Sequence, residues 1–255
     1  MRTLPLDKFV EKAKAGDLPL GAVITMADEA VTEIAAAAGF DFVWIDGEHG
    51  IIDRLTAQRH LVAATAQGLT ALYRVPACDH TEIKRVIDLG PDGIIVPMVM
   101  DGADAARAVS ACRYPCHGGD RGCGYRRSFR YGAWDMKEYL EVSKDYPMVI
   151  VQLEHIEAVR HLDEILAVPG LGSVLIGPYD LSMTMGKPGE WRDPEVASVF
   201  DEACRKIKAS GKLLGVYTEC DFDLWIRRGV DYMSIKNDTN ALLNGYRQKI
   251  GEVRK

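Results

Sequence analysis

The stretch from Phe40 to Gly50 changes from apolar to polar within one short run. It reads FDFVWIDGEHG, so the apolar residues Phe42 to Ile45 are followed directly by Asp46, Gly47, Glu48 and His49. In a parallel α/β fold, a buried strand delivers such polar groups at its carboxyl end, where active sites form. A histidine flanked by carboxylates suits proton transfer near neutral pH, because nearby negative charge favours its protonated form. The alternative is a solvated turn that only ends the strand.

Two carboxylates follow other apolar runs in the same way. Glu154 comes directly after MVIVQL, and Asp180 follows the run that ends in IGPY. Brought together without a cation, two carboxylates would repel each other and one pKa would rise. Their oxygens, with waters completing the coordination, suit Mg²⁺, Mn²⁺ or a similar divalent ion. The alternative is that each residue only caps the helix after it.

Three further strand ends carry nitrogen or amide groups. Arg74 offers a planar fork for a carboxylate or an oxyanion, unless it forms a surface ion pair. Gln152 lies two residues before Glu154, so both side chains lie on the same face of their strand. Lys236 could form a Schiff base, which would need no metal, or could lie exposed and pair with Asp238. The second interpretation of Lys236 is favoured.

Strand-like runs and amphipathic helices alternate along the chain, which is typical of βα units. The predicted strands span residues 20–26, 40–46, 69–75, 93–99, 148–153, 173–176, 213–217 and 231–235. The predicted helices span residues 28–38, 53–67, 81–89, 103–112, 136–144, 156–167, 194–210 and 222–228, with a last helix closing the chain. Eight units in 255 residues predict an α/β fold of the (β/α)8 TIM barrel class. A doubly wound sheet is less favoured, because no G-x-G-x-x-G follows the first strand.

Residues 113–135 interrupt this rhythm with a stretch rich in glycine and arginine. An irregular insertion of this length in a compact domain is usually functional or mobile. Cys112, Cys116, His117 and Cys123 lie close together in or beside it, but not in the paired C-x-x-C spacing of a zinc ribbon. Ordinary reduced cysteines are favoured over a structural zinc site.

Composition narrows the class of protein. The net charge of -6 argues against general nucleic-acid binding, which needs a basic face. No run of eighteen apolar residues is present, so no membrane span is expected. The first twenty residues lack the apolar core of a signal peptide, and a cytoplasmic location is therefore expected.

Six short motifs together resemble the HpcH/HpaI family of class II pyruvate aldolases. They are IDGEHG at 45–50, YRVP at 73–76, VPMV at 96–99, the RYP and RG-x-G pattern across 113–124, QLEH at 152–155 and IGPYDLS at 176–182. The similarity runs from about residue 18 to residue 240, in the family's order and spacing.

The resemblance implies one domain over residues 1–255, a (β/α)8 barrel of the phosphoenolpyruvate/pyruvate type. It implies a homo-hexamer built as a dimer of trimers, with the last helix, residues 239–253, exchanged between neighbouring subunits. It also implies a divalent metal cofactor, Mg²⁺, Mn²⁺ or Co²⁺, held by Glu154 and Asp180. Pyruvate or another 2-oxo acid would bind that metal, and an aldehyde would be the second small-molecule partner.

The same resemblance implies roles for individual residues. Arg74 would stabilise an enolate oxygen, and His49 would be the base. Asp46 and, across a subunit boundary, Asp88 would orient that base. The residues expected to contact substrate are Gln152, Gly177, Pro178, Tyr179 and Arg121. The implied reaction removes the proton from the 4-hydroxyl of a 4-hydroxy-2-oxo acid and breaks the C3–C4 bond.

Two departures from the family pattern bear on the substrate. Tyr179 stands where the family usually has a small residue or Asn, so the size of the bound molecule should differ. The arginines of the insertion, Arg121, Arg126, Arg127 and Arg130, suggest an acidic substrate tail. Two other functions stay open: a lyase or decarboxylase acting on a 2-oxo acid or a CoA ester in the same barrel, and a binding protein for an organic acid.

Overall fold

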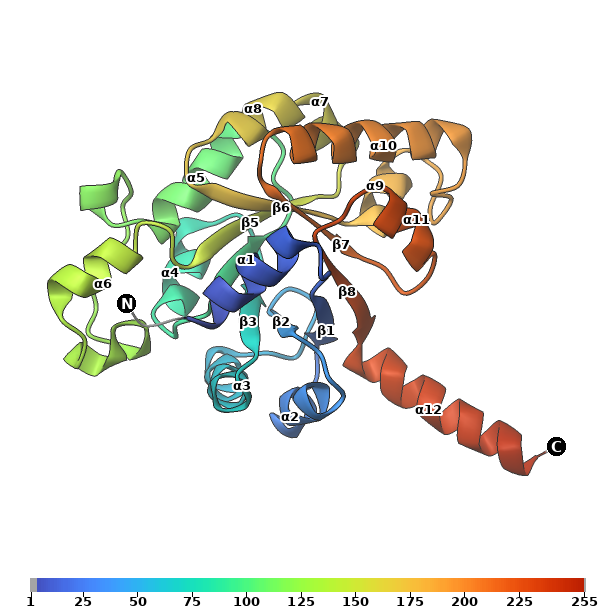
Figure 1. Ribbon diagram of the computed structural model, residues 1–255, viewed down its shortest axis with the longest axis horizontal. Helices are drawn as coiled ribbons and strands as arrows, with labels where there is room; N and C mark the ends of the chain where they lie inside the picture. Colours follow the sequence, from blue (N-terminus) through green and yellow to red (C-terminus); the bar gives the residue numbers. More distant parts are fainter. Residues whose placement is uncertain (1–3, 255) are drawn as a thin grey trace.

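Eight parallel strands close into a barrel in sequential order, from β1 to β8 and back to β1 (Figure 1). The computed structural model describes residues 4–254. The strands are β1 (Leu20–Ile24), β2 (Phe42–Asp46), β3 (Thr70–Arg74), β4 (Gly93–Val96), β5 (Met148–Leu153), β6 (Leu171–Ile176), β7 (Leu213–Tyr217) and β8 (Tyr232–Asn237). The predicted (β/α)8 barrel is confirmed, because a doubly wound sheet would have two open edges.

Helices alternate with the strands and cover the outside of the barrel. They are α2 (Ala30–Ala37), α3 (Arg54–Gln67), α4 (His80–Ile87), α5 (Gly102–Cys112), α6 (Met136–Val142), α7 (Ile156–Arg160), α8 (Leu162–Ala167), α9 (Pro178–Thr184), α10 (Pro194–Ala209) and α11 (Phe222–Arg227). Aspartate side chains accept backbone N–H groups at the start of several helices, for example Asp53 from Thr56. The single helix predicted over 156–167 is two short helices that meet at His161. The helix predicted over 28–38 begins only at Ala30, whose amide is bonded to the Asp28 side chain.

Side chains inside the barrel follow the two-residue period of the strands. In β2, Phe42 and Trp44 belong to the interior cluster, and Asp46 continues the same row toward the carboxyl end. Gly215 leaves room for this filling, because a Cβ there would lie 2.2 Å from the ring of Tyr232. The apolar interior therefore ends in a polar layer at the carboxyl ends of the strands.

Helix α1 (Pro5–Ala15) closes the amino-terminal end of the barrel. Its buried residues Leu6, Phe9 and Ala13 join the interior cluster. The Phe9 ring meets those of Phe42 and Tyr232 edge-on, with centroids 5.3 and 5.1 Å apart. The helices predicted from the sequence do not include α1, although its apolar residues follow helical spacing.

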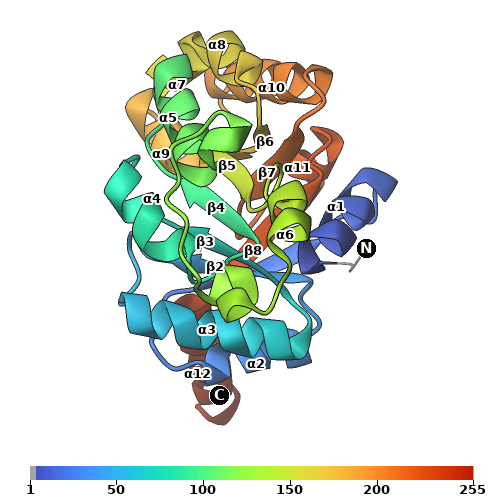
Figure 2. The same cartoon turned by 90° about the vertical axis from the view of Figure 1, so that its left-hand side faces the viewer.

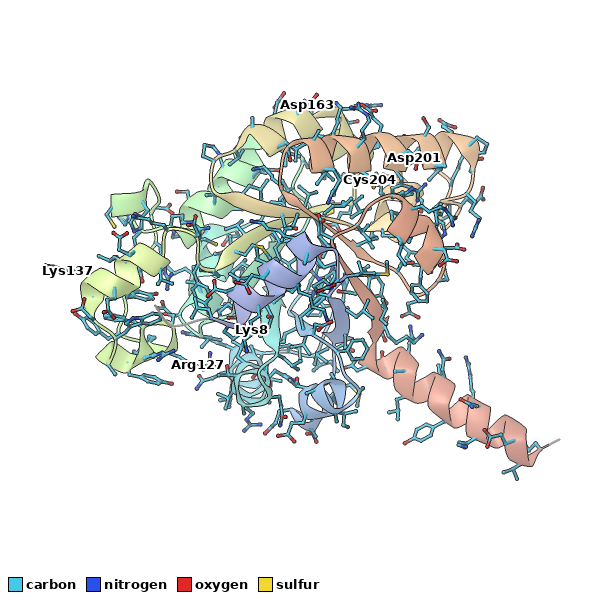
Figure 3. The ribbon with its side chains drawn as sticks, viewed as in Figure 1. Lys8, Arg127, Lys137, Asp163, Asp201 and Cys204 are labelled. Carbon is cyan, nitrogen blue, oxygen red and sulfur yellow. The ribbon has the colours of Figure 1, made fainter. Side chains whose placement is uncertain are left out.

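The insertion at 113–135 packs against α6, and together they form a small additional unit at one side of the barrel (Figure 2). Tyr114, Phe129 and Tyr139 form its own apolar cluster. Arg127 fastens it to the barrel by donating to the carbonyls of Leu89 and Leu61, at 2.8 and 3.1 Å, and Figure 3 places Arg127 beside α3. The insertion is thus held by defined contacts.

Helix α12 (Asp238–Val253) extends away from the barrel (Figure 1). It carries exposed apolar side chains at Leu242, Leu243, Tyr246, Ile250 and Val253. Over residues 4–254, no helix combines the length and the apolar character that a membrane crossing requires.

Candidate active site

A pocket of about 230 Å³ opens at the carboxyl ends of the strands. The predicted residues that line it are Asp46, His49, Arg74, Gln152, Gly177, Pro178, Tyr179 and Asp180. They come together because each follows or ends a strand of the barrel, and parallel strands all end at the same face. Glu154 is buried beside this group and bonds to Gln152.

Arg74 lies at the centre of the hydrogen-bond network. Its Nε and Nη2 donate to the two carboxylate oxygens of Asp46, at 2.9 and 2.6 Å, in a bidentate pair. Its Nη1 lies 3.2 Å from Gln152 Oε1 and 2.8 Å from Glu48 Oε2. The guanidinium also lies 4.8 Å from the centroid of the Trp44 ring. Arg74 is therefore a buried cation whose orientation is set on every side.

Asp46 also shapes the turn that carries His49. Its Oδ1 accepts the backbone N–H groups of Glu48 and His49, at 3.0 and 3.2 Å. The His49 side chain is exposed, with its Nε2 3.8 Å from Glu48 Oε2. Asp46 thus positions His49 through its backbone, and Glu48 is the carboxylate nearest to the imidazole.

Glu154 is a buried carboxyl group with an altered protonation equilibrium. Its Oε1 accepts the Met98 amide at 2.6 Å, and its Oε2 accepts Nε2 of Gln152 at 2.7 Å. Burial raises its pKa to about 7, with Glu48 and Asp180 adding negative charge, while the Met98 amide opposes the shift. Burial and the neighbouring carboxylates thus outweigh the stabilising effect of Arg74 on the ionised form of Glu154.

Asp180 reaches the pocket from the short helix α9, which starts directly after β6. Gly177 makes this approach close, because a Cβ there would lie 3.1 Å from Glu154 Cβ and 3.3 Å from Glu154 Oε2. Pro178 then begins the helix at its first position. Glu154 and Asp180 consequently face the same space.

The donor chemistry of this space fits a divalent cation. Two carboxylates, one of them buried, converge where Glu48 adds further negative charge. The nearby cation, Arg74, is already paired with Asp46 and Glu48. Within residues 4–254 no group of three or more His, Cys, Asp or Glu side chains could hold a metal by itself. Glu154 and Asp180 would therefore need oxygens from water or substrate to complete a coordination shell.

Comparison with known proteins shows the family to which the chain belongs. The model of the HpcH/HpaI aldolase/citrate lyase family matches residues 22–224. The chain belongs to this family. It is 35% identical over 243 residues to a 4-hydroxy-2-oxovalerate aldolase of Rhodococcus jostii, covering 93% of this chain and 92% of the relative. It is 32% identical to a hydroxypyruvate/pyruvate aldolase of Pseudomonas aeruginosa, covering 98% of this chain and 94% of the relative.

Solved structures agree with this membership of the HpcH/HpaI family. A family member from Burkholderia cenocepacia matches with a TM-score of 0.89 and 28% identity, covering 97% of this chain and 99% of that chain. The resemblance predicted from the motifs is confirmed. So is the enzyme class, a carbon–carbon lyase of the pyruvate aldolase type, and metal dependence is general in this family.

Two predicted site residues lie away from the pocket of their own chain. Asp88 follows α4, so it lies at the amino-terminal end of the barrel, opposite the pocket. Arg121 lies beside it, with its Nη2 3.6 Å from Asp88 Oδ1 and 2.9 Å from the Tyr139 hydroxyl. Since Arg121 is only 2% exposed, its guanidinium serves the packing of the insertion within one chain. Neither residue joins the group around Arg74.

Lys236 is held by an ion pair that the sequence did not indicate. Its Nζ lies 2.5 Å from Glu219 Oε2. The partner named from the sequence, Asp238, instead accepts the backbone N–H groups of Thr25 and Met26, both at 2.8 Å. A Schiff base needs an amine that is free to attack a carbonyl carbon, whereas this Nζ is engaged by the Glu219 carboxylate.

Several pocket residues were given no role in the sequence analysis. Glu48 contacts Arg74, and burial raises the pKa of its carboxyl group despite that cation. The pocket is also lined by Thr25, directly after β1, and by Tyr217 and Asn237, the last residues of β7 and β8. The two-residue period of the strands was the available signal, since Thr25 and Tyr217 each lie two residues beyond an inward position, Val23 and Gly215.

Proposed function

We propose that the protein is a divalent-metal-dependent aldolase that reversibly cleaves a 4-hydroxy-2-oxo acid to pyruvate and an aldehyde. The observation that carries this proposal is the pocket at the carboxyl ends of the strands, which Arg74 and Asp180 line and beside which Glu154 is buried. Membership of the HpcH/HpaI family supports it.

Glu154 and Asp180 are the residues that would hold the metal, which we propose to be Mg²⁺, Mn²⁺ or Co²⁺. When bound, such an ion supplies positive charge that polarises the carbonyl oxygen of a 2-oxo acid. Gln152 contributes by fixing Glu154, since its Nε2 donates to that carboxylate. Gly177 and Pro178 keep the backbone of the β6–α9 turn close to the same carboxylate.

Arg74 stabilises negative charge on the substrate oxygen. Its Nη2 carries two N–H groups and donates one of them to Asp46, which leaves one for a substrate oxygen. The fork needs no rearrangement during the reaction, because Asp46 and Glu48 already fix it.

His49 moves the proton. Its exposed imidazole accepts the proton of the 4-hydroxyl group, directly or through a water molecule. The C3–C4 bond then breaks: its electron pair becomes the enolate of pyruvate, and C4 becomes the carbonyl carbon of the aldehyde. Protonation of the enolate at C3 completes the cleavage.

We also propose a homo-hexamer, a dimer of trimers, in which α12 is exchanged between neighbours. The support is the row of exposed apolar side chains on α12, which its own barrel leaves uncovered. In such an assembly Asp88 would act at a neighbour's pocket, where it orients His49. This accounts for the distance of Asp88 from the pocket of its own chain.

The test is release of pyruvate from a panel of 4-hydroxy-2-oxo acids, coupled to lactate dehydrogenase, with and without EDTA. Release that stops with EDTA and returns with Mg²⁺ or Mn²⁺ is expected. Release that survives EDTA and stops with borohydride would transfer the chemistry to Lys236. No release from any member of the panel would favour a different lyase reaction.

A further inference from the structure

One side of the pocket is polar but carries no charged side chain. Four residues line it: Thr25, which follows β1, Tyr179 of α9, Tyr217 of β7 and Asn237 of β8. We call these four residues the polar wall. The charged groups Asp46, Arg74 and Asp180 belong to the remainder of the pocket. The two parts therefore suit different portions of one bound molecule.

The cation behind the polar wall is engaged by a carboxylate. Glu219 Oε2 pairs with Lys236 at 2.5 Å, and Glu219 Oε1 accepts the Tyr217 hydroxyl at 2.6 Å. Burial alone would raise the pKa of Glu219, but these hydrogen bonds outweigh it and the pKa is lowered. Asp238, bonded to Thr25, adds a second carboxylate. Lys236 is therefore not free to attract an anion.

The polar wall has hydrogen-bonding groups of both kinds. The Thr25 hydroxyl donates to Asp238 Oδ1 at 2.5 Å, so its oxygen can still accept. The Tyr217 hydroxyl donates to Glu219, and its oxygen accepts Asn237 Nδ2 at 3.3 Å. Asn237 uses its Oδ1 to accept the Asn240 amide at 2.8 Å. Its Nδ2 makes two long contacts, to Tyr217 and, at 3.4 Å, to Glu219, and a hydroxyl group of a ligand can replace either.

This combination matches a hydroxyl group, which both donates and accepts. A carboxylate can only accept, and it would face two acceptor oxygens backed by the carboxylates of Glu219 and Asp238. An alkyl chain would leave the polar groups without partners, which is costly in a desolvated site. Two arginines of the insertion, Arg121 and Arg127, bond within the protein and do not change this balance.

We propose that the polar wall selects a short, uncharged, hydroxylated aldehyde as the second substrate, bound through its hydroxyl groups by Tyr217, Asn237 and Thr25. This inference rests on the proposed aldolase function, with the charged part of the pocket taking the 2-oxo acid. The volume of about 230 Å³ limits both fragments together to small molecules.

The test is aldol addition of pyruvate to matched aldehydes. Glyceraldehyde is compared with propanal, and succinic semialdehyde with butanal, as ratios of kcat/KM. We expect the first ratio to be about tenfold or more, as one or two hydrogen bonds would give, and the second to be below one. A first ratio near one, or a preference for succinic semialdehyde, would overturn the proposal.

Two variants sharpen the test. Tyr217→Phe should lower the glyceraldehyde-to-propanal ratio by about tenfold, because one partner of the hydroxyl is lost. Glu219→Gln should leave the charge of Lys236 unbalanced and raise the succinic semialdehyde-to-butanal ratio severalfold. Tyr131→Phe, the same change on an exposed tyrosine outside the pocket, should alter neither ratio. Unchanged ratios in both test variants would remove the polar wall as the selective element.

Exchange of the methyl protons of pyruvate in D₂O distinguishes failure of this inference from failure of the proposed aldolase function. Exchange needs only the part of the pocket that binds the 2-oxo acid, so Tyr217→Phe should retain it. Loss of exchange together with loss of all aldol addition in the unmodified protein would refute the proposed aldolase. Intact exchange with the wrong aldehyde preference would refute the polar wall alone.

Discussion

Arg74 shows how a buried cation depends on its partners. Asp46 and Glu48 both pair with it, and its side chain is almost fully enclosed. Removing such a cation would leave Asp46 as an uncompensated buried charge, which typically costs about 3–5 kcal/mol of stability. An alanine at this position should therefore lower stability as well as catalysis.

Arg74→Lys should therefore be compared with Arg74→Ala. We expect both to lower kcat for pyruvate release by roughly 10² to 10³, because an ammonium cannot reproduce the planar fork and alanine removes it. The lysine variant should keep a melting temperature nearer to that of the unmodified protein. Near-normal kcat in the lysine variant would show that charge, and not the fork, is what matters.

Glu154 makes stability depend on pH. Its pKa is raised from 4.5 to about 7 by burial, so the folded protein binds this proton more tightly than the unfolded chain. Its contribution to stability is complete below pH 4.5 and is lost as the pH rises to about 7, a change of roughly 3 kcal/mol. A divalent cation beside the carboxylate would offset this loss.

Glu154→Gln tests that sign in metal-free protein. The amide does not ionise, so stability of the variant relative to the unmodified protein should improve between pH 4.5 and pH 7. Urea denaturation at several pH values measures it, with the exposed Glu190→Gln as the control. A stability difference that does not vary with pH would contradict the burial argument.

At the scale of elements, the two ends of the barrel have different roles. The strands hold the pocket at their carboxyl ends, and α1 seals the other end with Phe9 against Phe42 and Tyr232. A stable interior and a reactive pocket are therefore stacked along the same axis, with Trp44 and Arg74 in contact where they meet.

Phe9→Ala should destabilise the amino-terminal end of the barrel and leave the chemistry of the pocket nearly unchanged. We expect a loss of about 3–5 kcal/mol in the free energy of unfolding, because a buried aromatic ring leaves a cavity. The value of kcat should change less than twofold, by about the scatter seen for sites that share no partners. Urea denaturation and pyruvate release measure the two effects, and Phe222→Ala, on a partly exposed phenylalanine, is the control. A large drop in kcat with stability intact would contradict this division.

At the scale of the whole molecule, α12 is anchored to the barrel by its first residues, and the rest of the helix is exposed. Leu242, Tyr246, Ile250 and Val253 recur at helical spacing along it, and all are exposed. Its first residue, Asp238, holds the backbone of Thr25 and Met26 at the rim of the pocket. Docking of α12 on a neighbour would therefore bear directly on the pocket.

Replacing Leu242, Leu243 and Tyr246 together by serine should dissociate the proposed hexamer, because the apolar contact would be lost. Sedimentation velocity should show smaller species, with circular dichroism reporting an intact barrel. Gln248→Ser is the matched change at a polar position of α12. An unchanged sedimentation coefficient in the triple variant would argue against exchange of this helix.

The amino-acid sequence alone determined the barrel and the positions of Asp46, Arg74, Gln152, Glu154 and Asp180 within it. Each of these residues lies near or shortly after the carboxyl end of an apolar strand, and parallel strands deliver their carboxyl ends to one face. These positions follow from the local sequence pattern and the rule for parallel sheets, so no knowledge of the tertiary structure is needed.

Only the tertiary structure decided the partners. Lys236 pairs with Glu219 instead of Asp238, and Arg121 is buried in the insertion instead of facing the pocket. The polar wall joins β1 to β7 and β8, which meet only because the barrel closes, with Thr25 bonded to Asp238 across 213 positions of sequence. Local periodicity carries no information on such contacts, because the closing of the barrel and the packing of side chains set them.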